Sequence, residues 1–114
     1  MKIQKFEDII AWRKAKELAI ACCRAFAKLD DFTFRNQVLG AALFIVNNIA
    51  EGFERRSNKE LRRFLFIPKG SCGEVRSMLY IALELRYITL KEYDNLNGRC
   101  LEISKMLSGF AHKL

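Results

Sequence analysis

The densest group of side chains that could bind a ligand is a basic stretch between residues 55 and 69. Its only acid is Glu60, and its cations are Arg55, Arg56, Lys59, Arg62, Arg63 and Lys69. At 100° per residue, most of these cations fall on one outer side of a helix, with Phe66 among them and Tyr80 further along. Cations near a helix start oppose its dipole, which favours a partner over a role in helix stability. Cations interleaved with an aromatic ring suit phosphate contacts and base stacking, so the stretch predicts a nucleic-acid-binding surface. The structural alternative is a solvated helix face with Phe66 in a subunit contact.

A second polar group consists of Asn48 and Glu51, which lie three residues apart beside apolar Ile45 and Ile49. Catalysis would need a nucleophile or a second acid with a base in reach, and the sole histidine is His112 at the C-terminus. We therefore expect Asn48 and Glu51 to form a structural polar network between helices, with Glu51 paired to a lysine or arginine or capping a helix start. No catalytic residue is predicted, and the chain is not expected to be an enzyme.

The four cysteines are Cys22, Cys23, Cys72 and Cys100, and no C-x-x-C pair is present. Without closely spaced ligand pairs a metal site is not expected, and the cysteines are predicted to be reduced and buried as small apolar residues. Residues 69–71 read Lys-Gly-Ser but lack the earlier glycine of a phosphate-binding loop. No cofactor is therefore predicted.

Composition places the chain among globular proteins. Its 114 residues suit one domain, covering 1–114, and 51% of them are hydrophobic while 29% are charged. The formal net charge of +7 attracts polyanions. No signal peptide is seen and no apolar run is long enough to cross a bilayer, which predicts a cytoplasmic protein with no membrane partner.

Apolar residues recur at steps of three and four along four segments, approximately 7–29, 34–53, 58–86 and 90–112. Serine or threonine followed three residues later by glutamate begins the last two segments, at Ser57 and Thr89, as in a capping box. Helices of this length with short connections predict an all-α fold, an antiparallel up-down-up-down four-helix bundle.

Two features of these helices depart from a simple bundle. Pro68 lies inside the third helix, where we expect a kink near residues 64–72, with two shorter helices as the alternative. The second helix is apolar on every side around residues 38–46, which favours burial against another copy of the chain over deep insertion between the other helices. The candidate oligomer interface comprises Leu39, Leu43, Phe44 and Val46.

Three stretches resemble a bacterial family of small four-helix-bundle proteins found in intervening sequences of 23S ribosomal RNA genes. Residues 6–15, FEDIIAWRKA, look like its F-E-D-L-x-x-W-x-K-A opening, and residues 47–52 contain its N-I-A-E-G centre. Residues 56–65 and 69–75 resemble its R-x-S-x-K-E-F-x-R-F-L and G-S-x-x-E-L elements. The resemblance runs from about residue 5 to residue 110.

This resemblance implies a homopentamer whose biochemical role is not established. It also implies kinship in fold with accessory variability proteins of diversity-generating retroelements, which are basic pentamers that bind nucleic acid and a reverse transcriptase. The implied partners are thus other copies of the chain, RNA or DNA, and a protein such as a reverse transcriptase. The sequence departs from the family at four places. Leu39-Gly40 stands where the family has a basic pair, and Phe44 stands where it has a small residue. Pro68 replaces the family's usual alanine, and Arg86 replaces its usual glycine.

Together these observations predict a non-enzymatic, oligomeric, basic bundle that associates with RNA or DNA phosphates without strong sequence specificity. The alternative is a protein–protein interaction scaffold with no nucleic-acid role, in which the charge serves solubility.

Overall fold

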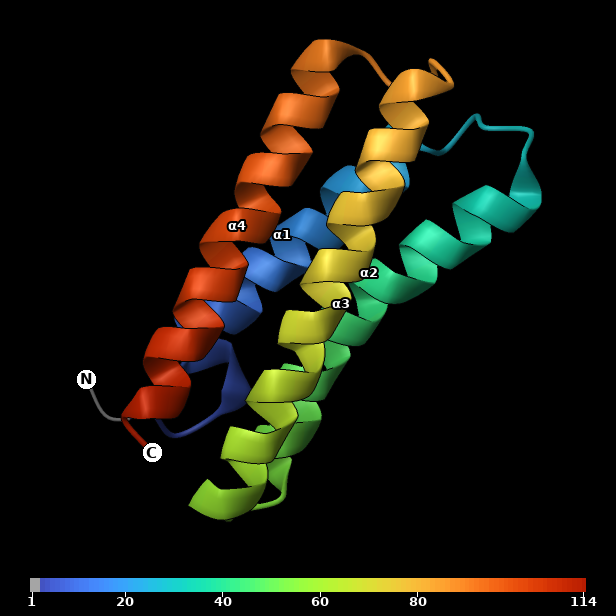
Figure 1. Cartoon of the computed structure of the whole chain (residues 1–114). Helices are drawn as coiled ribbons and strands as arrows, with labels where there is room; N and C mark the ends of the chain where they lie inside the picture. Colours follow the sequence, from blue (N-terminus) through green and yellow to red (C-terminus); the bar gives the residue numbers. More distant parts are fainter. Residues whose placement is uncertain (1–2) are drawn as a thin grey trace.

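The computed structural model describes residues 3–114, and within them four helices pack against one another and no strand occurs (Figure 1). The elements are a 3-10 turn η1 (Phe6–Asp8) and the helices α1 (Ile10–Ala25), α2 (Phe32–Glu54), α3 (Asn58–Glu84) and α4 (Leu90–His112). Each helix packs on its neighbours in sequence, and α1 also packs on α4. The predicted all-α fold with four helices is confirmed.

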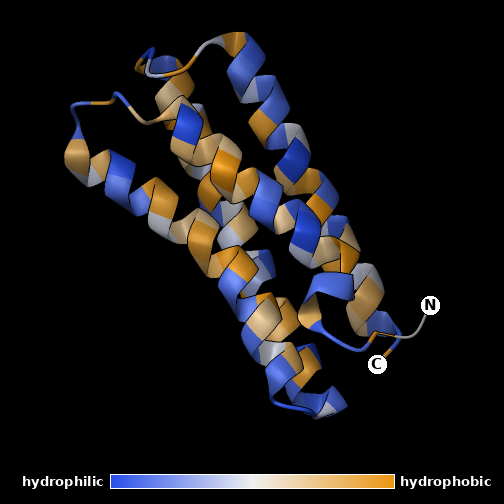
Figure 2. Cartoon of the chain, turned by 180° about the vertical axis from the view of Figure 1, so that it is seen from behind, coloured by the Kyte–Doolittle hydropathy of each residue, from blue (hydrophilic) through white to orange (hydrophobic). Residues whose placement is uncertain are grey.

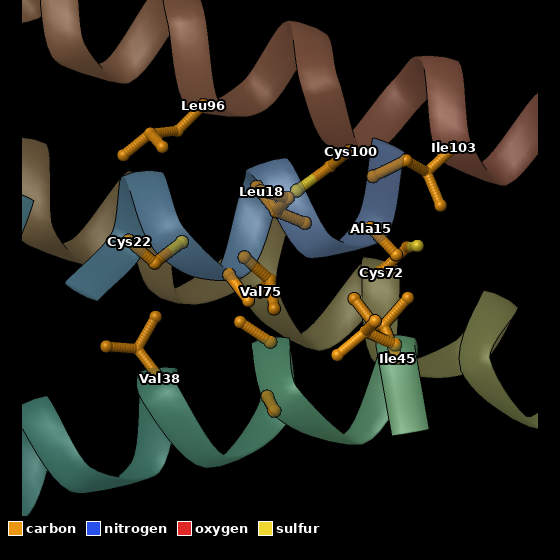
Figure 3. Close-up of a cluster of buried hydrophobic side chains, with 14 of the residues drawn as sticks. Ala15, Leu18, Cys22, Val38, Ile45, Cys72, Val75, Leu96, Cys100 and Ile103 are labelled. Carbon is orange, nitrogen blue, oxygen red and sulfur yellow. The ribbon is translucent and has the colours of Figure 1, made fainter. Parts of the chain in front are cut away.

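The core is built from apolar side chains that all four helices direct inward (Figure 3). Ala15, Val38, Val75 and Ile103 are among them, and each is fully buried. Since each such residue lies three or four positions from the next inward residue of its helix, the periodicity of the sequence accounts for this core.

Three of the four cysteines, Cys22, Cys72 and Cys100, lie in this core (Figure 3). Burial raises the pKa of the Cys22 thiol to about 12 and that of Cys72 to about 11, and it raises the pKa of Cys100 as well. These thiols are therefore protonated at neutral pH and pack as small apolar groups. Cys23 differs from the prediction, because it is exposed on the outer side of α1.

The first helix is shorter than the predicted 7–29. The carboxylate of Asp8 accepts hydrogen bonds from the backbone N–H groups of Gln4 and Lys5, at 3.0 and 3.2 Å, and this stabilises the separate turn η1. Ile9 then takes an extended backbone conformation and buries its side chain before α1 begins. At the other end, α1 stops before Phe26, which is fully buried and whose ring lies 6.1 Å from that of Phe34.

The third helix runs through Pro68 without interruption, so the alternative of two shorter helices is wrong. Pro68 is itself buried, and the core residues Leu65 and Cys72 flank it on the same side of α3. A proline inside a helix removes one backbone hydrogen bond at a cost of about 3 kcal/mol. Packing of this apolar side against the other helices offsets that loss.

The two predicted capping boxes differ in their geometry. Thr89 and Glu92 form the full reciprocal pair, with backbone-to-side-chain distances of 3.1 and 2.8 Å. Ser57 accepts a hydrogen bond from the Glu60 N–H at 3.3 Å, whereas the Glu60 carboxylate faces two arginines. The start of α3 thus has only the first of the two hydrogen bonds of a capping box, the one that Ser57 accepts.

The apolar helix α2 uses one side for the core and leaves apolar residues on another. Figure 2, seen from behind, shows hydrophobic segments along much of α2 and a hydrophilic turn after its end. Leu43 and Phe44 are 45% and 48% exposed in the single chain, and Leu39 is half-buried. Val46 is buried in the chain's own core, so it is removed from the candidate oligomer interface. Among residues 3–114, no helix has both the length and the apolar character needed to cross a membrane.

Candidate nucleic-acid interface

The basic stretch begins in a tight turn between α2 and α3. Gly52 makes this turn possible, because a Cβ atom at this position would lie 2.5 Å from the Cβ atom of Phe64 on α3. Arg56 then takes a left-handed backbone conformation with φ of 58°. Glycine is favoured in that conformation and an arginine there is strained, so the turn carries this cation at a cost in stability.

All seven predicted binding residues are exposed, but half of the cations are paired with acids of the same chain. Arg55 lies 3.0 Å from Glu51 and 3.7 Å from Glu60. The remaining pairs are Arg56 with Glu54 at 3.9 Å and Arg63 with Glu60 at 3.6 Å. The count of a single acid in residues 55–69 missed Glu51 and Glu54, because they precede the turn in sequence and lie beside it in space.

The paired arginines also cover aromatic rings. Arg55 and Arg63 lie over the ring of Phe64, with guanidinium-to-centroid distances of 5.0 and 5.8 Å. Arg56 lies over Phe53 in the same way, at 5.1 Å. These contacts suit cation–π attraction and hold the arginines against the chain. We conclude that the paired arginines have a structural role at the turn.

The other three cations, Lys59, Arg62 and Lys69, have no ion-pair partner among residues 3–114. Arg62 lies 5.9 Å from the ring centroid of Phe66, which is 50% exposed. This side of α3 therefore presents positive charge without an ion-pair partner beside a half-exposed aromatic ring, over which Arg62 lies. This part of the predicted surface has the geometry that contact with phosphates and bases requires.

Two residues beyond the basic stretch extend this side of α3. Arg76 donates from Nε to Oδ1 of Asn97 on α4, at 3.1 Å. Tyr80 is 56% exposed, and its ring lies 5.3 Å from that of Tyr93. Arg76 was missed because it follows a gap in the charged run. Its spacing of seven residues from Lys69, two helical turns, was the available signal.

Of the two residues predicted to form a polar network between helices, Glu51 of α2 is linked to Glu60 of α3 through Arg55, whereas Asn48 takes no part. Asn48 is buried, and its amide donates to the carbonyl of Phe44 in its own helix at 2.7 Å. Glu51 is exposed and pairs with Arg55, which confirms its expected pairing with a basic residue. The two side chains are not joined because Asn48 lies on the buried side of α2 while Glu51 reaches solvent at its end.

No arrangement typical of catalysis accompanies this surface. Within residues 3–114, no three His, Cys, Asp or Glu side chains come close enough to hold a metal ion. An open hollow of about 560 Å³ lies where α1 begins and α4 ends, lined mainly by apolar groups such as Ile9, Ile10, Met106 and Phe110. The charged residues of its lining are Asp8, Arg13 and Lys113.

A family model of the 23S rRNA-intervening sequence protein matches residues 7–109. The chain belongs to this family. Among solved structures, a protein of unknown function from the S23 ribosomal protein family of Bacteroides thetaiotaomicron VPI-5482 has the same fold, with a TM-score of 0.83. The two are 23% identical, and the similarity covers 90% of this chain and 98% of the other. No similar sequence was found among curated proteins. The range that matches the family model includes both the turn after Gly52 and the outer side of α3.

Proposed function

We propose that this chain is a non-enzymatic, oligomeric basic bundle of the cytoplasm that associates with RNA or DNA phosphates without strong sequence specificity. The observation that carries the proposal is the presence of Lys59, Arg62 and Lys69 on one exposed side without an ion pair to any residue of the described range 3–114. Free cations on a helix face release counterions from a nucleic acid when they contact its phosphates. Such contacts carry no base-specific information, and the expected binding is therefore general.

The proposal includes an antiparallel up-down-up-down order of the helices. In support, Lys14 lies 3.9 Å from Glu102, and Glu17 lies 3.8 Å from Arg99. Residue numbers that rise along α1 thus pair with numbers that fall along α4. Connections as short as the turn after α2 favour the same order for the other helices.

The proposed assembly is a homo-oligomer, and the family resemblance suggests a pentamer. Exposed Leu43 and Phe44, with half-buried Leu39, support a contact between copies through α2. Five copies with a net charge of +7 each would carry about +35, and weak contacts with a polyanion would become multivalent.

A salt series with labelled structured RNA tests the proposal by fluorescence polarisation. The double variant Arg62→Glu and Lys69→Glu reverses two free cations of α3. The matched control, Lys28→Glu and Lys91→Glu, makes the same change in net charge at exposed positions near the opposite end of α3. We expect the first pair to abolish binding and the second to retain most of it, because local phosphate contacts, and not the net charge alone, determine affinity.

Absence of binding by the parent protein at low salt would overturn the proposal. Equal loss of affinity in the two double variants would show that the net charge, and not the α3 surface, attracts the RNA. Light scattering on each variant checks that its oligomeric state equals that of the parent.

The second candidate function is a scaffold for another protein, such as a reverse transcriptase. Exposed Leu43 and Phe44 favour it, since apolar side chains on one helix face suit a protein contact. The pairing of Arg55, Arg56 and Arg63 within the chain also leaves less free charge than the sequence suggests. The same titration separates the two functions, because a scaffold of this kind binds no RNA.

A further inference from the structure

We infer that the outer side of α3 binds single-stranded RNA or DNA through cations and aromatic rings that lie in one row. The residues, called here the α3 stripe, are Arg62, Phe66, Lys69, Arg76 and Tyr80. This inference rests on the proposed association with nucleic acid, and it names the form of nucleic acid that the surface accepts.

The spacing of the α3 stripe places its members in one row. Arg62, Lys69 and Arg76 are separated by seven residues each, which corresponds to about 10 Å along a helix. Phe66 lies between the first two cations, and Tyr80 follows the third by one turn. The row extends over about 27 Å in total, at 1.5 Å per residue. A strand lying along α3 would thus meet a cation, a ring, two cations and a second ring in turn.

Two cations of the α3 stripe, Arg62 and Lys69, are exposed, and the third, Arg76, is partly buried. None of them forms an ion pair among residues 3–114, in contrast to the arginines of the turn. Arg76 uses Nε for its bond to Asn97, and no hydrogen bond within the described chain occupies its two terminal nitrogens. Between residues 61 and 83 the only acid is Glu74, which is rotated by about 120° from the row and lies beside α2.

The rings of the α3 stripe present accessible faces. Phe66 and Tyr80 are 50% and 56% exposed, and contact with Tyr93 on α4 holds the ring of Tyr80. Gly73 occupies the row between Lys69 and Arg76, and a Cβ atom there would meet no neighbour within 4 Å. The middle of the row is therefore recessed, and a sugar could approach the helix backbone there.

These features favour a single strand over a duplex. The bases of a duplex are stacked on one another, so its outside offers phosphates and grooves but no free base face. A single strand can place bases on exposed rings while its phosphates reach nearby cations. Stacking also removes the exposed apolar surface of Phe66 from water, which phosphate contacts alone would not do.

Polarisation titrations with labelled twelve-nucleotide oligo(U), oligo(dT) and a blunt RNA duplex of the same length test this inference. The variants are Phe66→Leu and Tyr80→Leu, which remove a ring without changing charge. The matched control is Phe32→Leu, because Phe32 is 59% exposed and has Arg35 over its ring at 4.9 Å but lies on α2.

We expect each stripe variant to weaken binding of a single strand by about five-fold or more, the effect of losing one stacked base. The dependence on salt should stay unchanged because no cation is removed. Duplex binding should stay within about two-fold of the parent value, and Phe32→Leu should have no effect on any probe. The ratio of affinities for oligo(U) and oligo(dT) then shows which sugar the surface prefers.

Other outcomes separate this inference from the function on which it rests. Unchanged single-strand affinity in both ring variants, with a loss in Arg62→Glu and Lys69→Glu, would overturn the stacking and leave phosphate association in place. No binding of any probe by the parent protein would overturn both. A change of oligomer mass in Phe66→Leu, measured by light scattering, would place the ring between subunits and overturn the α3 stripe.

Discussion

Two arginines take backbone conformations that favour glycine, and the reason is local. Arg56 and Arg86 follow the ends of α2 and α3 with φ of 58° and 61°. A left-handed residue at this place lets the chain leave the helix while its N–H group bonds back to the last turn. The side chain of any residue other than glycine is crowded there. The glycine that the family resemblance suggests at position 86 is thus explained by the backbone.

We predict that Arg86→Gly stabilises the protein by about 1 kcal/mol, since relief of the crowding exceeds the added freedom of the unfolded chain. This should raise the midpoint of thermal unfolding by about 4 °C. Arg86→Ala is the control, because alanine removes the charge but keeps the Cβ atom. An equal gain in both variants would mean that the charge, and not the backbone, is the source of the effect.

Gly52 is needed for a different reason, namely the close approach of α3. A Cβ atom there would lie 2.5 Å from the Cβ atom of Phe64 and 3.3 Å from Cδ1 of Leu61. We expect Gly52→Ala to destabilise the protein by about 1–3 kcal/mol in urea unfolding, because the Cβ atom of Phe64 moves only with the backbone.

The matched control for Gly52 is Gly98→Ala in α4. Apart from its chain neighbours and the backbone of its own helix, nothing lies within 4 Å of a Cβ atom placed at Gly98, which is exposed. Alanine is the better helix former, so this variant should gain up to about 1 kcal/mol. Similar losses at the two glycines would contradict the role given to the contact with Phe64.

At the scale of the element, α3 combines the buried proline and the proposed binding surface in one helix. Pro68 and the core residues Leu65 and Cys72 lie on the buried side of α3, while Arg62 and Lys69 are exposed to solvent. Continuity of the helix through Pro68 keeps the cations on both sides of it in phase. The arrangement of the surface therefore depends on the packing of the opposite side.

We predict that Pro68→Ala stabilises the protein by about 1–2 kcal/mol. It restores a backbone donor to the helix interior, a gain of about 3 kcal/mol, and it loses part of a buried side chain, a cost of about 1 kcal/mol. Chemical unfolding measures the difference, and RNA affinity should not change because the surface cations keep their phase. A loss of stability would show that packing of the proline ring outweighs the missing hydrogen bond.

At the scale of the whole molecule, the apolar residues outside the core concern assembly. Leu43 and Phe44 leave one side of α2 uncovered, although eight residues of the same helix are buried. The net charge of +7 favours the solubility of a single chain. Burial of the exposed apolar side chains against a second copy would nevertheless lower the free energy, because it removes them from water.

We predict that Leu43→Lys lowers the mass of the oligomer at micromolar concentration, as measured by light scattering. The introduced ammonium group would have to be buried without a partner in the contact between copies. Phe32→Lys, at an apolar residue that is also exposed but lies at the start of α2, should leave the mass unchanged. A parent protein that is already a monomer would contradict the proposed assembly.

The spacing of apolar residues and the local capping motifs of the sequence predicted much of this fold. The steps of three and four residues determine which side of each helix is apolar, so Ala15, Val38, Val75 and Ile103 could be assigned inward from the sequence. The cap of Thr89 and Glu92 has only local partners and was predicted fully. The exposed positions of Arg62, Phe66 and Lys69 also follow from helical phase.

Only the tertiary structure decided how these parts combine. The conformation of the turn brought Glu51 and Glu54 beside Arg55 and Arg56, which follow them by four and two residues, and it left Arg62 and Lys69 unpaired. The tertiary structure also buried Val46 and exposed Cys23, because the path of neighbouring helices determines what covers a residue of given phase. The sequence by itself thus determined the four helices and their faces. The packing of those helices determined which apolar side chains remain exposed, because that depends on where chain segments distant in sequence meet.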